Sequence, residues 1–139
     1  MNLATLRAEG EDDALAHLCK ALGLSLDSTW KKGEPKRRGG VHPLSGFVAT
    51  IADSANSGEM VRSIRQFLAE CKARGVAFAG ANLSSELSVG VTVGDSVQFV
   101  AFVDLTAEDL SSLGSLGINL SVAAYPSSDE ANAADETAA

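Results

Sequence analysis

The chain has 139 residues, a formal net charge of −7 and 45% hydrophobic residues. This size and composition are typical of one soluble globular domain that folds without metal or disulfide support. Every apolar run is shorter than a membrane span, and the first residues lack a signal-peptide pattern. We therefore expect a cytoplasmic protein that does not enter a membrane.

The charges are distributed unevenly along the chain. Residues 1–74 contain all 11 Lys and Arg and nine of the 18 Asp and Glu, a net charge of +2, whereas residues 75–139 contain the other nine acids and no base, a net charge of −9. An acidic surface repels nucleic acid and anionic lipid and attracts basic proteins. The charge pattern favours a protein partner and disfavours nucleic acid and membrane.

The first thirty residues predict a strand, a helix and an extended segment. Residues 3–8 alternate between apolar and polar side chains, as in a strand. Residues 11–22 repeat leucine at helical spacing, and Gly23 can end that helix in the left-handed conformation. Residues 24–30 alternate again, and Trp30, the only tryptophan, is expected to anchor them as a core lid or an interface residue.

A basic loop is predicted over residues 31–40, where Gly and Pro interrupt a run of cations. Four of these, Lys32, Lys36, Arg37 and Arg38, are candidate anion ligands, although a solvated loop is the simpler interpretation. His42 follows the loop and is the histidine best placed to meet a substrate. Its simpler interpretation is an exposed loop residue.

The middle of the chain predicts a strand and the clearest helix. Residues 47–51 have the β-branched and aromatic content of a strand. Ser57 is a candidate N-cap for a helix that ends at Arg74-Gly75. The cysteines, Cys19 and Cys71, lie on the apolar sides of the two helices and are expected to be core thiols.

A hairpin, a third helix and a last strand are predicted in the remaining folded part. Residues 83–93 and 97–103 both alternate and are joined by Gly94-Asp95, which favours a hairpin with a buried second strand. Thr106 and Asp109 have the spacing of a capping box. Residues 118–125 then alternate as a strand. The residues predicted to be buried are Leu15, Leu18, Leu22, Ile64, Phe67, Leu68, Phe99 and Leu110.

Together these elements predict an α+β fold, with a largely antiparallel sheet of about five or six strands and three helices on one face. Residues 1–126 form the predicted single domain. Residues 127–139 have no large apolar side chain and are predicted to be a disordered acidic tail. The oligomeric state and the strand order do not follow from the sequence.

No catalytic or metal-binding motif is present in the sequence. Metalloprotease, phosphate-loop, dinucleotide-binding and nucleophile-elbow motifs are all missing. We therefore expect no enzymatic activity, catalytic residue, metal or cofactor.

Several of these features together resemble a known family. They are Leu22-Gly23, Trp30, Lys32-Gly33, the region around Gly117, and Tyr125-Pro126, spread over residues 3–126. In this order they resemble the small bacterial proteins grouped as domain-of-unknown-function family 4279. Members often carry a second Trp where this chain has Phe47. Some members look like immunity proteins, which bind a secreted bacterial toxin and protect the cell that produces it.

The sequence thus favours a non-enzymatic acidic protein-binding module, namely a bacterial immunity protein that neutralises a toxin. The predicted partner-binding residues are Glu86, Asp95, Asp104, Glu108, Asp109 and Trp30. One alternative is an anion or small-molecule binding module, or an enzyme, that uses the loop from Lys31 to His42. Another is a phage-encoded inhibitor of a host defence system, which differs only in its target.

Overall fold

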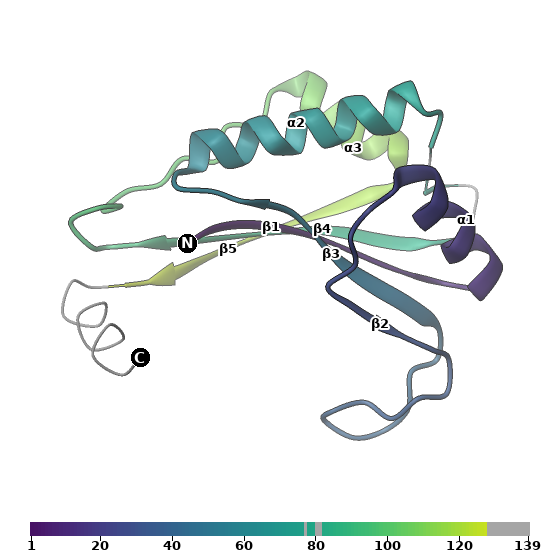
Figure 1. Ribbon diagram of the computed structural model, residues 1–139. Helices are drawn as coiled ribbons and strands as arrows, with labels where there is room; N and C mark the ends of the chain where they lie inside the picture. The colour runs from purple at the N-terminus through teal and green to yellow at the C-terminus, as the bar shows by residue number, and fades with distance from the viewer. Residues whose placement is uncertain (77, 80–81, 128–139) are drawn as a thin grey trace.

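The computed structural model describes residues 1–76, 78–79 and 82–127 (Figure 1). The elements, in chain order, are β1 (Asn2–Gly10), α1 (Asp12–Leu22), β2 (Ser28–Trp30), β3 (Ser45–Asp53), α2 (Ser57–Ala73), β4 (Ser84–Val93), α3 (Ala107–Leu116) and β5 (Ile118–Pro126). The strands form one five-stranded sheet in the order β2-β3-β1-β4-β5, antiparallel except for the parallel pair β4 and β5. This architecture confirms the predicted α+β fold class.

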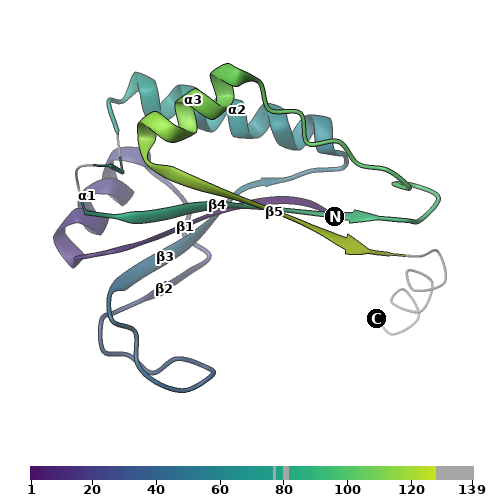
Figure 2. The ribbon, with the colours of Figure 1, turned by 180° about the vertical axis from the view of Figure 1, so that it is seen from behind.

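The core lies between the sheet and the helices. Figures 1 and 2 show α2 and α3 lying across one face of the sheet, with α1 at one end. Ala4, Leu6 and Ala8 of β1 are fully buried in the cluster that includes the leucines of α1, whereas Arg7 is exposed. Because side chains alternate along a strand, Arg7 lies on the opposite, open face.

The helix boundaries follow from the capping residues. Gly23 ends α1 in the left-handed conformation at φ 61°, as predicted. Thr106 and Asp109 form the predicted capping box at the start of α3. The predicted cap of α2 is wrong by one residue. Asn56 precedes the helix, and its side chain accepts a hydrogen bond from the Glu59 backbone N–H at 2.9 Å, whereas Ser57 lies in the first turn.

The predicted hairpin is wrong in its second strand. β4 forms as expected, but residues 97–103 form no strand. One edge of β4 pairs with β1 and the other pairs with β5, so β4 has no free edge for residues 97–103. As a result, Phe99 is 74% exposed and not buried. Leu110 of α3, also predicted to be buried, is 50% exposed.

The other residues predicted to form the core are buried. They are Leu15, Leu18, Leu22, Ile64, Phe67 and Leu68. Cys71 is fully buried and Cys19 is partly buried. Within the described part of the chain, no helix is long and apolar enough to cross a membrane. The predicted disordered tail lies outside the described residues, except for Ser127.

Candidate functional site

The connection between β4 and α3 exposes an unusual number of apolar side chains. Its inward residues, Ala101, Val103 and Leu105, are partly buried against the core. Its outward residues are 59–89% exposed and comprise Val97, Phe99, Val100 and Phe102. The connection is therefore anchored over residues 101–105 and exposes large apolar side chains over residues 97–102.

Two apolar side chains of β5 are also uncovered. Leu120 pairs with Leu87 and Val122 pairs with Val89 in the register of β4 and β5, so all four lie on the helix-covered face. Leu87 and Val89 are buried, but Leu120 is 36% exposed and Val122 is 51% exposed. Ile118, at the start of β5 next to α3, is buried. The helix layer thus covers only the beginning of β5.

The end of β5 is hydrogen-bonded to the beginning of the connection between β4 and α3. The Ser127 backbone N–H donates to the Val93 carbonyl at 2.7 Å, and Ser127 Oγ donates to Asp95 Oδ2 at 3.5 Å. Asp95 Oδ1 in turn accepts hydrogen bonds from the backbone N–H groups of Val97 and Gln98. We refer to Val97, Phe99, Val100, Phe102, Leu120 and Val122 together as the apolar edge.

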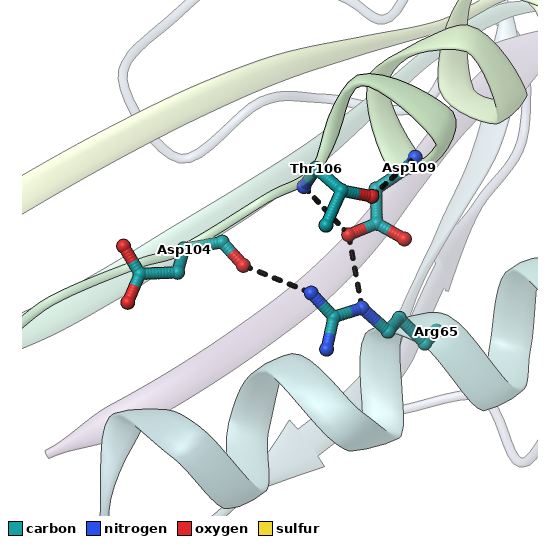
Figure 3. A network of polar contacts seen from close by, with 4 residues as sticks. All are labelled: Arg65, Asp104, Thr106 and Asp109. Atoms are coloured by element: carbon teal, nitrogen blue, oxygen red, sulfur yellow. Dashed lines mark hydrogen bonds and ion pairs between the residues drawn. The ribbon is translucent and has the colours of Figure 1, made fainter.

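The acids predicted to bind a partner divide into exposed and internal groups. Asp104 and Glu108 are exposed. Asp104 follows the apolar edge in the chain, whereas Glu108 lines a groove between α2 and α3 with Arg65 and Lys72. Asp95 is buried and organises the turn after β4. Asp109 is also buried, and its Oδ2 accepts hydrogen bonds from the Thr106 backbone N–H and from Arg65 Nε, both at 2.9 Å (Figure 3). Asp95 and Asp109 therefore support the fold and do not offer a free carboxylate.

The network around Asp109 also positions Asp104. Arg65 Nη2 donates to the Asp104 carbonyl at 3.2 Å, while the Asp104 carboxylate points away from the network (Figure 3). Burial by itself raises the pKa of the Asp109 carboxyl. The hydrogen bonds from Thr106 and the interaction with Arg65 outweigh that effect and hold this pKa below its ordinary value. Asp109 is thus a fixed negative charge that neutralises Arg65.

Glu86 and Trp30 lie away from the apolar edge. Glu86 is exposed on the open face of β4, where it accepts a hydrogen bond from Ser88 Oγ. Trp30 lies in β2, at the other end of the sheet order from β5. Its ring stacks on His42 at 5.1 Å and lies 4.8 Å from the Arg7 guanidinium. Its buried Nε1 has no hydrogen-bond partner among the described residues.

The basic loop folds back on itself like a hairpin and extends away from the sheet (Figure 1). The His42 and Glu34 backbones are hydrogen-bonded at 2.9 Å, and Pro35 bridges to Val41. The candidate anion ligands Lys32, Lys36, Arg37 and Arg38 are all exposed. Among the described residues, the ion pairs are Arg7 with Glu9 and Arg65 with Asp109, so none of the four candidates is paired.

The structure therefore does not gather the predicted partner-binding residues at one place. Asp104 follows the apolar edge in the chain, and Glu108 lies in the groove between α2 and α3. Glu86 lies on the open face, and Trp30 supports the basic loop. Sequence reasoning missed the apolar edge itself. The only sign of the apolar edge in the sequence was that residues 97–103 are apolar on both faces. This pattern is typical of a buried strand, but also of a segment that exposes one apolar face to a binding partner.

Neither metal geometry nor similarity to known proteins adds a further assignment. No group of three or more His, Cys, Asp or Glu residues in the described part of the chain is arranged to hold a metal ion. Comparisons with known protein families, curated proteins and solved structures found no match for this chain. The resemblance noted from the sequence therefore stays a prediction.

Proposed function

We propose that this protein is a non-enzymatic acidic protein-binding module, a bacterial immunity protein that binds and neutralises a toxin in the cytoplasm. One observation carries the proposal. Four large apolar side chains, from Val97 to Phe102, project into solvent from a segment that contains acids and no base. The resemblance to immunity-like proteins points to the same class of function.

Covering the apolar edge favours binding energetically. Burying a large apolar side chain contributes about 1.5–3 kcal/mol. Large contiguous exposed apolar patches mark interaction sites on soluble proteins. The inward residues Ala101, Val103 and Leu105 already hold the connection against the core. A partner therefore meets a segment that is partly ordered in advance, which lowers the entropy cost of association.

The surrounding charge indicates a basic partner. Residues 95–127 contain the acids Asp95, Asp104, Glu108 and Asp109 and no base. Of these, Asp104 and Glu108 are exposed, and Asp104 is two residues from Phe102 in the chain. Complementary charge accelerates association and excludes like-charged competitors. A toxin domain with an apolar surface surrounded by Lys and Arg matches this site in both respects.

The test is binding between this protein and a toxin, sought first among the products of the neighbouring genes. The double variant Phe99→Ala and Phe102→Ala should weaken the complex by on the order of 100-fold, because large apolar anchors dominate such interfaces. Val41→Ala is the matched control, since Val41 is 58% exposed but lies in the basic loop. If the neighbouring gene products neither bind this protein nor poison the cell, the proposal fails.

The anion-binding alternative keeps one specific observation in its favour. Lys36, Arg37 and Arg38 are exposed and unpaired within the described residues, on a loop closed by its own hydrogen bonds. A ligand that binds the native state raises the melting temperature by mass action. If inorganic phosphate or pyrophosphate raises the melting temperature and replacing the three cations by Ala abolishes the rise, the loop is an anion site.

A further inference from the structure

β5 is a long edge strand without the usual protection against pairing with another chain. Among the described strands it is bonded only to β4, and its register is continuous from Ile118 opposite Ser85 to Pro126 opposite Val93. No charged residue lies within it. Natural edge strands are normally short, charged, bulged or covered, because an open edge is a template for pairing. The other edge strand, β2, has only three residues.

The outer backbone of β5 is open. Alternate residues of a strand direct their N–H and C=O groups to opposite sides, so about half of these groups point away from β4. Within the described residues, no backbone hydrogen bond outside the β4 ladder involves residues 119–126. All of these residues except Ala123 are exposed. Solvent, and not another part of the described chain, meets this edge.

We propose that β5 accepts an extended segment of a partner protein as a sixth strand of the sheet. This inference rests on the proposed protein-binding function and specifies how the partner is held. Backbone hydrogen bonds to β5 would supply affinity, and alternate side chains would supply specificity. The added strand would place apolar side chains beside Leu120 and Val122, which are 36% and 51% exposed. A nine-residue pairing would extend over roughly 30 Å.

The charge around β5 determines which kind of strand can pair with it. Residues 95–127, which include β5, contain four acids and no base, and the exposed Glu86 of β4 lies opposite Asn119 of β5. A strand flanked by Lys or Arg is therefore attracted to it. Pairing between the β5 strands of two copies of this chain would instead bring two such acidic, base-free segments together. The geometry and the charge thus favour a basic foreign strand over self-association.

The experiment uses a synthetic peptide of alternating valine and threonine residues with two lysines at each end. Amide hydrogen exchange of this protein is measured by NMR with and without the peptide. The amides of Asn119–Tyr125 that do not bond to β4 should exchange at least about tenfold more slowly at saturation, because a strand pairing protects them. A glutamate-flanked peptide should bind at least about tenfold more weakly, and a peptide with alternate N-methylated residues should give no protection.

Two variants test whether the protection from hydrogen exchange depends on β5. Val122→Lys places a charge on the exposed, helix-facing row of β5 and should abolish the protection. Val41→Lys changes a residue of similar exposure in the basic loop and should leave the protection within about twofold. Absence of protection in β5 with the lysine-flanked peptide overturns the proposal. Concentration-dependent dimers that protect the same amides without peptide also overturn it, in favour of a second copy.

The failure of strand addition is distinguishable from failure of the proposed function. If the toxin binds and Phe102→Ala weakens that complex, but the β5 amides gain no protection in it, the protein-binding function stands and strand addition is wrong. If the lysine-flanked peptide protects β5 but no toxin is found to bind, strand addition stands and the immunity function is wrong.

Discussion

Arg65 Nε lies 2.9 Å from Asp109 Oδ2, so a single ion pair joins α2 to α3 at the carboxylate that also caps α3. Asp109 is buried, whereas its neighbour Glu108 is exposed. Two adjacent acids of the sequence thus have different roles. Glu108 can face a partner, and Asp109 holds the helix from which Glu108 projects.

Replacing Asp109 with Ala should lower the free energy of unfolding by about 1–3 kcal/mol, because it breaks the capping box and leaves Arg65 Nε and the Thr106 N–H without their acceptor. Glu108→Ala, the adjacent control, should change it by less than about 0.5 kcal/mol. Urea denaturation followed by circular dichroism measures both. Equal losses in the two variants would contradict the role assigned to Asp109.

The contribution of Asp109 should also depend on pH. The folded protein holds the Asp109 pKa below its ordinary value of 3.8, so the folded state favours the charged carboxylate. The resulting stability is fully present above that ordinary value and is lost as the pH falls through the lower folded pKa. The difference in unfolding free energy between the native chain and Asp109→Asn should therefore shrink on acidification below pH 3.8. A difference that stays constant down to about pH 2 would argue against this linkage.

Replacing one phenylalanine of the core and one of the apolar edge should have very different effects on stability. Phe67→Ala should cost about 3–5 kcal/mol, because it leaves a cavity beneath α2, whereas Phe99→Ala should cost less than about 0.5 kcal/mol. Phe67 is 6% exposed and Phe99 is 74% exposed. Denaturant titration of the two variants compares them directly. A large loss for Phe99→Ala would mean that residues 97–103 are packed as the hairpin strand predicted from sequence.

The failure of that hairpin prediction has a physical cause. Local patterns determine where helices begin and end, as Gly23 and the pair Thr106 and Asp109 show. They do not determine which strands become neighbours. Residues 97–103 have a good strand pattern, but β1 and β5 occupy both edges of β4, and these pairings come from distant parts of the chain. Strand order depends on the whole sheet, so it cannot be predicted from the apolar–polar alternation of one segment.

The candidate site was predictable only in part. The polarised charge of the sequence correctly placed acids around α3, yet it gave the same weight to Asp104 and Asp109. Only the fold shows that Asp109 faces Arg65 while the carboxylate of Asp104 points outward. Similarly, Trp30 was expected to be a lid or an anchor. Its contacts with His42 and Arg7 could not be deduced, because they join three separate segments.

The two cysteines should differ in reactivity. Burial, with a smaller contribution from Glu70, raises the pKa of the Cys71 thiol to about 11, although Arg74 opposes the shift. Burial also raises the pKa of the Cys19 thiol, but Cys19 is only partly buried. At about pH 7.5 a thiol reagent should modify Cys19 at least about tenfold faster than Cys71, because reaction needs an accessible thiolate. In urea the two rates should converge. Mass spectrometry of the labelled peptides gives both rates, and faster labelling of native Cys71 would contradict its burial.

Finally, the acidic residues of the folded domain and those of the tail should affect different steps of binding to a basic partner, namely dissociation and association. Asp104 and Glu108 are presented by an ordered scaffold, so they act at short range without an ordering cost. The tail acids are Asp129, Glu130, Asp135 and Glu136. We expect them to attract the partner only over the screening length, roughly 8 Å at physiological salt. Deleting residues 128–139 should slow association by about two- to threefold at low salt and leave dissociation nearly unchanged.

Reversing the exposed pair, with Asp104→Lys and Glu108→Lys, should weaken the complex by at least about tenfold, mostly through faster dissociation. Asp109 is left intact in this variant, because its reversal would unfold α3 and confuse binding with stability. Glu59→Lys is a matched control on the exposed start of α2. Surface plasmon resonance at low and high salt separates the rate constants. If the tail deletion abolishes binding and the reversed pair binds normally, the partner is held by the tail and not by the folded acidic surface.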